Sequence, residues 1–269
     1  MNVANVLEPI INKPIEQPGD YLGADGLLYC GKCHTRKQTH GEGVFAGRLL
    51  PVLCSCMIAE READELADRQ RRIEQNRVRC LPAEDMRRHR FEGADDAKHI
   101  SVCRRYAEKW EEVRAKNYGL LLFGNAGTGK SYAAHCIANA LIDREVSVFY
   151  ISAADLVEIL PDRERREDVL RRIRTVPLMI VDDLGAERPT SFSSEQICRA
   201  VDERAEAGKP LIVTTNYTLD EMRRCQDHEK QRIFDRLNAL CVPVAVVGES
   251  RRVALGAEKL RAAKALLGA

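Results

Sequence analysis

A glycine-rich stretch that ends in Lys130 and Ser131 is the part of the chain with the clearest chemical content. It has the pattern G-x-x-x-x-G-K-S and stands between an apolar run at residues 120–123 and a helical stretch at residues 132–143. Such glycines let backbone N–H groups face a phosphate at a helix N-terminus, whose dipole favours an anion. A chance glycine-rich turn is the alternative, but the flanking strand and helix favour a phosphate-binding loop. The residues predicted to bind ATP are Gly124, Asn125, Ala126, Gly127, Thr128, Gly129, Lys130 and Ser131.

Two adjacent carboxylates, Asp182 and Asp183, follow a second apolar run at residues 178–181. Beside a phosphate-binding loop, this arrangement predicts that Asp182 binds Mg²⁺ together with the Ser131 hydroxyl. Asp183 is then predicted to orient the attacking water, although many ATPases carry the longer glutamate at this position. The alternative is a strand-end turn with two solvated aspartates.

Asn216 follows a third apolar run at residues 211–215. Its amide is predicted to position the lytic water near the γ-phosphate, and the alternative is an ordinary turn residue. Because this run comes after the one that ends in the paired carboxylates, the sequence favours a role at the nucleotide.

Four of the ten cysteines are clustered, in the patterns Cys30-x2-Cys33 and Cys54-x-Cys56. Two such pairs separated by a loop can supply the four thiolates of one tetrahedral structural zinc site. His34 and His40 are possible substitutes if one cysteine does not bind the metal. The alternative is four unrelated reduced cysteines, but the segment has little apolar content to order it otherwise.

The elements that must position these residues follow from hydrophobic patterning. Five short apolar runs alternate with amphipathic helical stretches, which predicts an α/β fold with a mainly parallel five-stranded sheet. The runs lie at residues 120–123, 146–151, 178–181, 211–215 and 242–247. Pro243 lies in the last run, and because proline cannot donate to a strand ladder, that strand is expected at a sheet edge.

Upstream of the sheet, the sequence predicts a solvated charged helix at residues 57–79 and a second helix at about residues 97–116. The predicted domains are an N-terminal zinc-binding module at residues 1–79 and an ATPase domain at residues 80–269. A cluster of arginines at residues 163–174 could contact single-stranded DNA, but the acidic residues among them favour a salt-bridged surface helix.

Composition argues against a membrane protein and against a chain coated with one sign of charge. The 42 basic and 41 acidic side chains give a formal net charge of +1. No uninterrupted apolar run approaches the roughly 18 residues that a membrane span needs, and the N-terminus lacks a signal-peptide pattern. A cytoplasmic location is therefore expected.

The order of these motifs resembles that of AAA+ ATPases, and more narrowly that of the DnaC/DnaI-type bacterial and phage helicase loaders. The likeness rests on the phosphate-binding loop, the Ile-Val-Asp182-Asp183-Leu-Gly segment, Thr-Thr-Asn216 and Arg232-Ile-Phe-Asp-Arg236-Leu. It implies that Arg236 reaches the nucleotide of a neighbouring subunit and that Arg252 is a late sensor arginine. Arg232 is a competing candidate because it lies four residues from Arg236 on the same helical face.

The same resemblance implies the partners. A loader of this type binds a hexameric DnaB-type replicative helicase through its N-terminal module, contacts single-stranded DNA and self-associates through AAA+ interfaces. Two alternatives stay open from the sequence: an IstB-type transposition ATPase, which shares the core, and a nucleotide-gated DNA-binding adaptor with little hydrolysis. The cysteine module favours the loader, because the N-terminus of an IstB-type protein is expected to be helical and without zinc.

Overall fold

The computed structural model describes residues 16–95 and 97–268 of the chain. The chain divides into two compact units, residues 1–72 and residues 73–269, and the division falls inside helix α2 (Ser55–Cys80). This helix confirms the one predicted at residues 57–79. The first 15 residues of the predicted N-terminal module lie outside the described part of the chain.

The described part of the N-terminal unit consists of two antiparallel hairpins followed by the start of α2. Strand β1 (Tyr21–Leu22) pairs with β2 (Leu28–Tyr29), and β3 (Gln38–His40) pairs with β4 (Leu49–Pro51). A single 3-10 turn, η1 (Gly43–Phe45), lies within the second hairpin. Leu27 and Leu28 are among the few buried apolar side chains here, so the cysteines contribute much of its interior.

The second unit is built on a five-stranded sheet in which every pair of neighbouring strands is parallel, as the sequence predicts. The strands are β5 (Gly119–Phe123), β6 (Val148–Ser152), β7 (Leu178–Leu184), β8 (Leu211–Thr215) and β9 (Cys241–Ala245). Their order across the sheet is β6-β7-β8-β5-β9. Strand β9, which contains Pro243, lies at an edge, so that prediction is confirmed.

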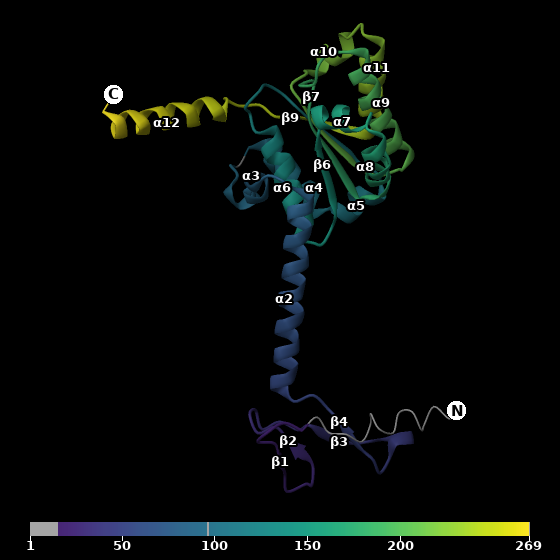
Figure 1. The fold of residues 1–269 in the computed structure, drawn as a ribbon, viewed down its shortest axis with the longest axis vertical. Coiled ribbons are helices and arrows are strands. Elements are labelled where there is room, and N and C mark those ends of the chain that lie inside the picture. The colour runs from purple at the N-terminus through teal and green to yellow at the C-terminus, as the bar shows by residue number, and fades with distance from the viewer. Residues whose placement is uncertain (1–15, 96, 269) are drawn as a thin grey trace. The chain divides into compact units, whose positions relative to one another are not determined.

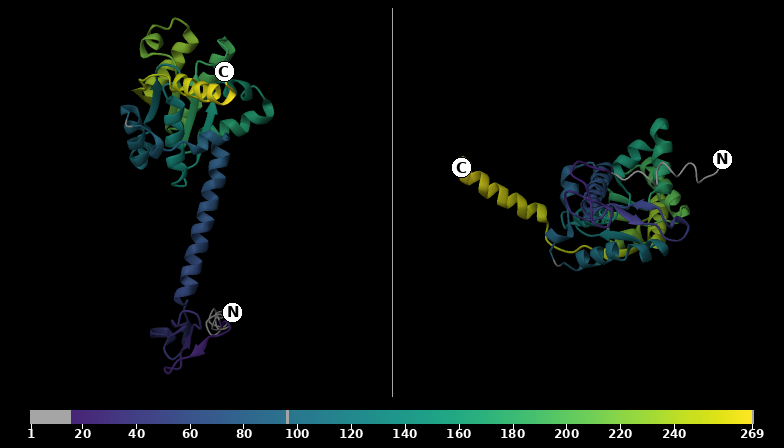
Figure 2. Two further views of the ribbon diagram at one scale, coloured as in Figure 1. Left: turned by 90° about the vertical axis from the view of Figure 1, so that its left-hand side faces the viewer. Right: turned by 90° about the horizontal axis from the view of Figure 1, so that it is seen from below.

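Helices cover both faces of this sheet (Figures 1 and 2). Leu120 and Leu122 face a core shared with α4 and α6, whereas Leu121 faces a core shared with α7, α8, α9 and α11. This alternation follows from the period of two in a strand. The helical elements of the unit are α3 (Glu84–Arg88), η2 (Phe91–Gly93), α4 (Lys98–Glu108), α5 (Trp110–Ala115), α6 (Lys130–Ile142), α7 (Ala153–Ile159), α8 (Arg163–Thr175), α9 (Ser191–Glu206), α10 (Leu219–Arg224), α11 (His228–Leu240) and α12 (Arg251–Leu267).

The prediction of a single helix at residues 97–116 is wrong in one respect. The structure has two helices there, α4 and α5, because Lys109 leaves helical geometry with φ −92° and ψ 26°. Trp110 can then bury its ring completely at the start of α5. Packing of this one large side chain outweighs the helical propensity of the segment.

A completely buried arginine joins the helix layer to the ends of two strands. All five N–H groups of the Arg204 guanidinium donate to backbone carbonyls, those of Ile173, Val176, Pro177 and Pro210, at 2.6 to 3.1 Å. Burial lowers the pKa of Arg204 to about 10. The guanidinium therefore stays charged at neutral pH and donates to carbonyls at the end of α8 and just before β7 and β8.

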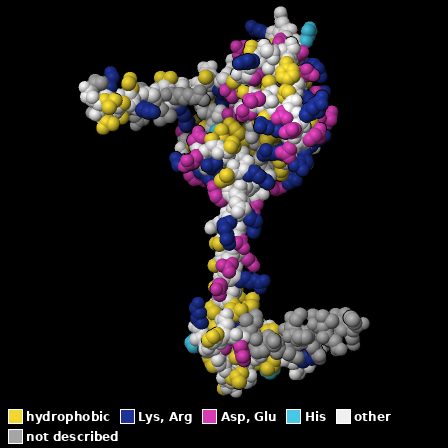
Figure 3. Space-filling model, viewed as in Figure 1, with side chains coloured by type: hydrophobic (Ala, Val, Ile, Leu, Met, Phe, Trp, Pro, Cys, Tyr) yellow, Lys and Arg dark blue, Asp and Glu magenta, His cyan; other side chains and the backbone are white. Residues whose placement is uncertain are grey.

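The surface of the second unit mixes both signs of charge on the face that Figure 3 shows. In the described part of the chain, no helix is long and apolar enough to cross a bilayer.

Candidate nucleotide-binding site

The loop between β5 and α6 has positive φ angles at three positions, and each of these positions is a glycine. Gly124, Gly127 and Gly129 have φ values of 147°, 82° and 101°. A Cβ atom at Gly124 would lie 2.3 Å from the carbonyl oxygen of Val246, and one at Gly127 would lie 2.2 Å from Oγ of Ser250. The predicted loop is therefore packed against the segment after β9, and its conformation depends on glycine.

Lys130 is the first residue of α6, and its ammonium is turned into this loop. Its Nζ donates to the carbonyl oxygens of Gly124 at 2.8 Å and Asn125 at 2.7 Å, and to Oδ1 of Asn216 at 2.7 Å. The side chain is only 6% exposed. A charge held in this way beside a helix N-terminus is placed to bind a phosphate anion.

The paired carboxylates lie on an irregular turn of β7. The pairing of β7 with β8 shifts register between Val181 and Leu184, and Asp183 has a left-handed φ of 58°. The side-chain oxygen Oδ1 of Asp183 accepts a 3.1 Å hydrogen bond from Nδ2 of Asn216. Asn216 therefore contacts both Lys130 and Asp183.

The two oxygens of Asp182 have separate partners. The Tyr150 hydroxyl donates to Oδ2 at 2.5 Å, and the Thr214 hydroxyl donates to Oδ1 at 2.6 Å. Burial raises the pKa of Tyr150, and the neighbouring Asp182 charge raises it further. The phenol therefore keeps its proton and acts as the donor in this pair.

A cavity of about 500 Å³ brings most of the predicted nucleotide-site residues together, whereas Gly124, Asn125 and Thr128 of the same loop are not part of its lining. Its lining includes Ala126, Gly127, Gly129, Lys130, Ser131, Asp182, Asp183 and Asn216. The hydroxyl of Ser131 and the carboxylate of Asp182 are hard oxygen donors on one cavity, and these are the ligands that Mg²⁺ prefers. The residues present thus fit both a phosphate chain and the metal ion that accompanies it.

The cavity also contains residues that the sequence reasoning missed. His89 and His135 lie with their Nδ1 atoms 2.9 Å apart, and the His135 ring is 5.0 Å from that of Tyr150. Burial lowers the pKa of both histidines, that of His135 to about 4, so both rings are neutral. Nothing in the local sequence marks these residues, because α3, α6 and β6 bring them together from separate segments.

The late arginine that reaches this cavity is Arg251. It pairs with Asp95, lies 5.7 Å from the centre of the Tyr132 ring, and donates its backbone N–H to the carbonyl of Gly127 at 3.0 Å. The predicted sensor, Arg252, is the next residue of α12, and its side chain lies outside the described part of the structure.

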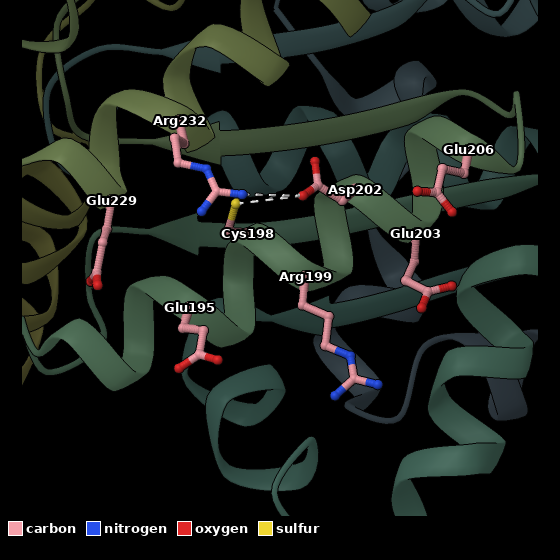
Figure 4. Close-up of a pocket in the computed structure, with 8 residues that line it drawn as sticks. All are labelled: Glu195, Cys198, Arg199, Asp202, Glu203, Glu206, Glu229 and Arg232. Carbon is pink, nitrogen blue, oxygen red and sulfur yellow. Dashed lines mark hydrogen bonds and ion pairs between the residues drawn. The ribbon is translucent and has the colours of Figure 1, made fainter.

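Arg236 and Arg232 lie on α11, away from the cavity, and share one partner on α9. Nε of Arg236 donates to Oδ1 of Asp202 at 2.8 Å, and Nη2 of Arg232 lies 4.0 Å from Oδ2 of the same carboxylate. Figure 4 shows Arg232 and Cys198 directed at Asp202 in a second cavity. Both arginines are more than half exposed, so both are available to a second molecule.

Helix α8 is a salt-bridged surface helix, as the sequence favours. Arg165 pairs with Asp162, Arg171 pairs with Asp168, and Arg174 pairs with Glu203. Three of the six arginines of this helix are therefore paired with carboxylates of the protein itself.

The four clustered cysteines meet in the N-terminal unit, with their sulfur atoms all within 4.8 Å of one another. Four sulfurs around one zinc ion, at about 2.3 Å from the metal, would lie roughly 3.8 Å apart. Hydrogen bonds from the hydroxyls of Ser55 and Thr35 lower the pKa of Cys33 to about 4, and backbone N–H groups lower that of Cys30. Hydrogen bonds with Cys54 and Cys30 raise the pKa of Cys56 to about 12, so the spacing of the four sulfurs, and not a shared thiolate character, is what fits a structural zinc site.

The fold and the cavity define the class: this is a P-loop protein with an AAA+-like α/β core. Residues 55–258 match the family described as IstB-like ATP binding protein, and the chain belongs to that family.

Two curated relatives are replicative helicase loaders. The chain is 29% identical to DnaI of Bacillus subtilis over 150 residues, which cover 51% of this chain and 48% of that protein. It is 27% identical to DnaC of Escherichia coli over 154 residues, which cover 55% of this chain and 60% of that protein. The chain thus spans about half to three fifths of the length of these relatives.

The structure is also similar to a crystal structure of DnaI, with a TM-score of 0.54 and 26% identity. The match covers 63% of this chain and 93% of that one. Homology to the DnaI and DnaC loaders, expected from the sequence motifs, is therefore confirmed.

Proposed function

We propose that this chain is an ATP-dependent helicase loader, which binds a hexameric DnaB-type replicative helicase and helps to place it on single-stranded DNA. The observation that carries this choice is the four-cysteine cluster. Cys30, Cys33 and Cys54 lie ahead of the residues that match the IstB-like family, so the segment that carries them is an addition to the shared ATP-binding core. Relatives with that core include two helicase loaders.

The N-terminal unit is the proposed docking element, and a zinc ion held by Cys30, Cys33, Cys54 and Cys56 is proposed to order it. The described part of the unit has short strands and few buried apolar side chains. Such a core contributes little stability without a metal. A role in partner binding therefore explains the presence of this unit better than a role in stability does.

The second unit is proposed to bind and hydrolyse ATP. Lys130 and the loop N–H groups would bind the phosphates, and Ser131 and Asp182 would hold Mg²⁺, which supplies positive charge against the phosphate oxygens. Asp183 would orient the attacking water, with its carboxylate held by the amide of Asn216 at 3.1 Å. Slow turnover, stimulated by self-association or DNA, is expected because the arginine for the γ-phosphate comes from another subunit.

Arg236 is the proposed arginine in trans, with Arg232 as the competing candidate. Both lie on α11 and neither lines the nucleotide cavity described above, so their own nucleotide is not the natural target. A neighbouring copy could present its nucleotide to them, which makes self-association part of the function.

The test is coexpression with the cognate replicative helicase. Full-length protein should co-elute with the helicase hexamer, and a Cys30→Ser, Cys33→Ser variant should not. Cys225→Ser is the matched control, because this half-buried cysteine lies outside the cluster. Retained helicase binding by the double variant, with its zinc lost, would contradict the docking role.

An IstB-type transposition ATPase is the second candidate, and the match over residues 55–258 is the observation that favours it. That function predicts binding to duplex DNA and no stable complex with a replicative helicase. A gated adaptor with little hydrolysis is the third, and turnover at saturating ATP separates it from an active ATPase.

A further inference from the structure

We propose that Tyr150 is a positioning residue for the Mg²⁺ site, because its hydroxyl fixes the carboxylate of Asp182. This inference rests on the proposed binding of ATP and Mg²⁺. The donor–acceptor distance is 2.5 Å, and both residues line the cavity that holds Lys130 and Ser131. No sequence motif assigns a role to Tyr150, which lies 32 residues before its partner.

The other carboxylate oxygen of Asp182 also accepts a hydrogen bond. The Thr214 hydroxyl donates to Oδ1 at 2.6 Å and accepts a 2.8 Å hydrogen bond from the backbone N–H of Asp183. This second bond fixes the direction of the hydroxyl proton toward Asp182. Each carboxylate oxygen has about two lone-pair sites, so one on each oxygen remains for a metal ion or its water.

Strand register explains how Tyr150 reaches its partner. Ser152 on β6 is the residue paired with Asp182, and Tyr150 is paired with Ile180. Tyr150 and Ser152 lie on the same face of the sheet, two residues apart. A tyrosine can lean along its strand and span this offset, whereas a serine or threonine at residue 150 could not.

The Tyr150 ring is itself held in place. It packs against His135, whose ring stacks on His89 with a centroid distance of 5.1 Å. The amide of Asn139 donates to the backbone carbonyl of His89 at 2.8 Å. The phenol therefore points at Asp182 before any ligand arrives, and no side-chain ordering is needed on binding.

The physical consequence is a selective effect on the metal. Outer-shell partners of metal-binding carboxylates typically contribute 10- to 100-fold in metal affinity. The phosphate contacts of Lys130 do not involve Tyr150, so nucleotide affinity without metal should be unaffected. A residue that acted only through packing would alter both.

The experiment measures a fluorescent ATP analogue against increasing Mg²⁺, and separately in EDTA, with full-length protein. In Tyr150→Phe the half-saturating Mg²⁺ concentration should rise about tenfold, while affinity in EDTA stays within about twofold of wild type. Tyr132→Phe is the matched control. Tyr132 also lines the cavity, but its hydroxyl donates to the carbonyl of Arg90, at 2.9 Å.

Thr214→Val provides a second route, because it removes the other hydrogen bond to Asp182 and should shift Mg²⁺ dependence in the same direction. Unchanged Mg²⁺ dependence in Tyr150→Phe would overturn the proposal. So would an equal loss of affinity in EDTA, which would assign Tyr150 to packing. Wild-type protein that binds no analogue at any Mg²⁺ concentration would instead refute the proposed ATP binding itself.

Discussion

The side-chain oxygen of Asn216 accepts a 2.7 Å hydrogen bond from the ammonium of Lys130. The amide nitrogen of the same side chain donates to Asp183, so one asparagine joins the lysine proposed to bind phosphate to the carboxylate proposed to orient water. We therefore expect substitutions of Lys130 to affect nucleotide binding and substitutions of Asn216 or Asp183 to affect turnover.

Nucleotide binding should depend on Lys130 and not on Asn216. Lys130→Ala removes a charge-assisted contact of up to about 3 kcal/mol and should weaken binding of a fluorescent ATP analogue by about 100-fold. Asn216→Ala leaves the ammonium and should keep binding within about threefold while turnover falls by about 100-fold. Circular dichroism controls for folding in both variants. Wild-type affinity in Lys130→Ala would refute the site.

Asp182 and Asp183 should divide their work. Asp183→Asn keeps the side-chain volume and should still bind MgATP, but turnover should fall by about 100-fold because the base that orients water is lost. Asp182→Ala should weaken Mg²⁺-dependent binding itself. Equilibrium binding and steady-state hydrolysis of both variants test this, and an equal loss of binding in both would contradict the division.

Arg236 should act on the nucleotide of a neighbouring molecule. Arg236→Ala should lower turnover by about 10³-fold without lowering ATP affinity, as for other arginines supplied in trans. Mixing Arg236→Ala protein with Lys130→Ala protein should restore part of the hydrolysis, because hybrid interfaces pair an intact site with an intact arginine. Hydrolysis by Arg236→Ala that equals wild type at every protein concentration would show that the arginine has no such role.

Arg232→Ala is the matched variant for this experiment. Both arginines pair with the Asp202 carboxylate, but Arg232 lies 4.0 Å from it and Arg236 only 2.8 Å. A loss of turnover confined to Arg232→Ala, with restoration in the same mixing assay, would transfer the role to that residue.

Purified protein should carry about one equivalent of zinc, bound by Cys30, Cys33, Cys54 and Cys56. Chelation should unfold the N-terminal unit and leave ATP binding intact, because the second unit has its own core. Elemental analysis and analogue binding before and after chelation measure both effects. Protein purified without chelator that contains no metal would argue against the site.

Replacement of the fully buried Arg204 should destabilise the second unit strongly. Arg204→Met removes five hydrogen bonds to buried carbonyls and should lower the free energy of unfolding by about 3 kcal/mol. Arg199→Met, on the exposed face of the same helix, should change it by less than about 0.5 kcal/mol. Urea denaturation followed by circular dichroism compares the two, and equal stability would show that the buried bonds contribute no net free energy.

Local patterning was enough to predict the five parallel strands and the motifs that follow them. Each strand carries its own apolar run, and the glycines around Lys130 and the carboxylates after β7 are read without knowing any distant contact. The edge position of β9 was predicted from Pro243, because the proline nitrogen has no hydrogen to donate to a neighbouring strand. The break of the helix at Lys109 was not predicted, and neither were the two hairpins of the N-terminal unit, whose strands are too short to show a period.

The contacts between distant side chains could not be predicted from the motifs. Lys130 and Asn216 are 86 residues apart, and Tyr150 reaches Asp182 across two neighbouring strands. Arg251 lies at the cavity because the segment after β9 packs on the phosphate loop, and Asp202 meets Arg236 because α9 lies against α11. Such contacts depend on strand order, register and helix packing, which are set by the burial of the whole core, whereas a motif depends only on its neighbours in the chain.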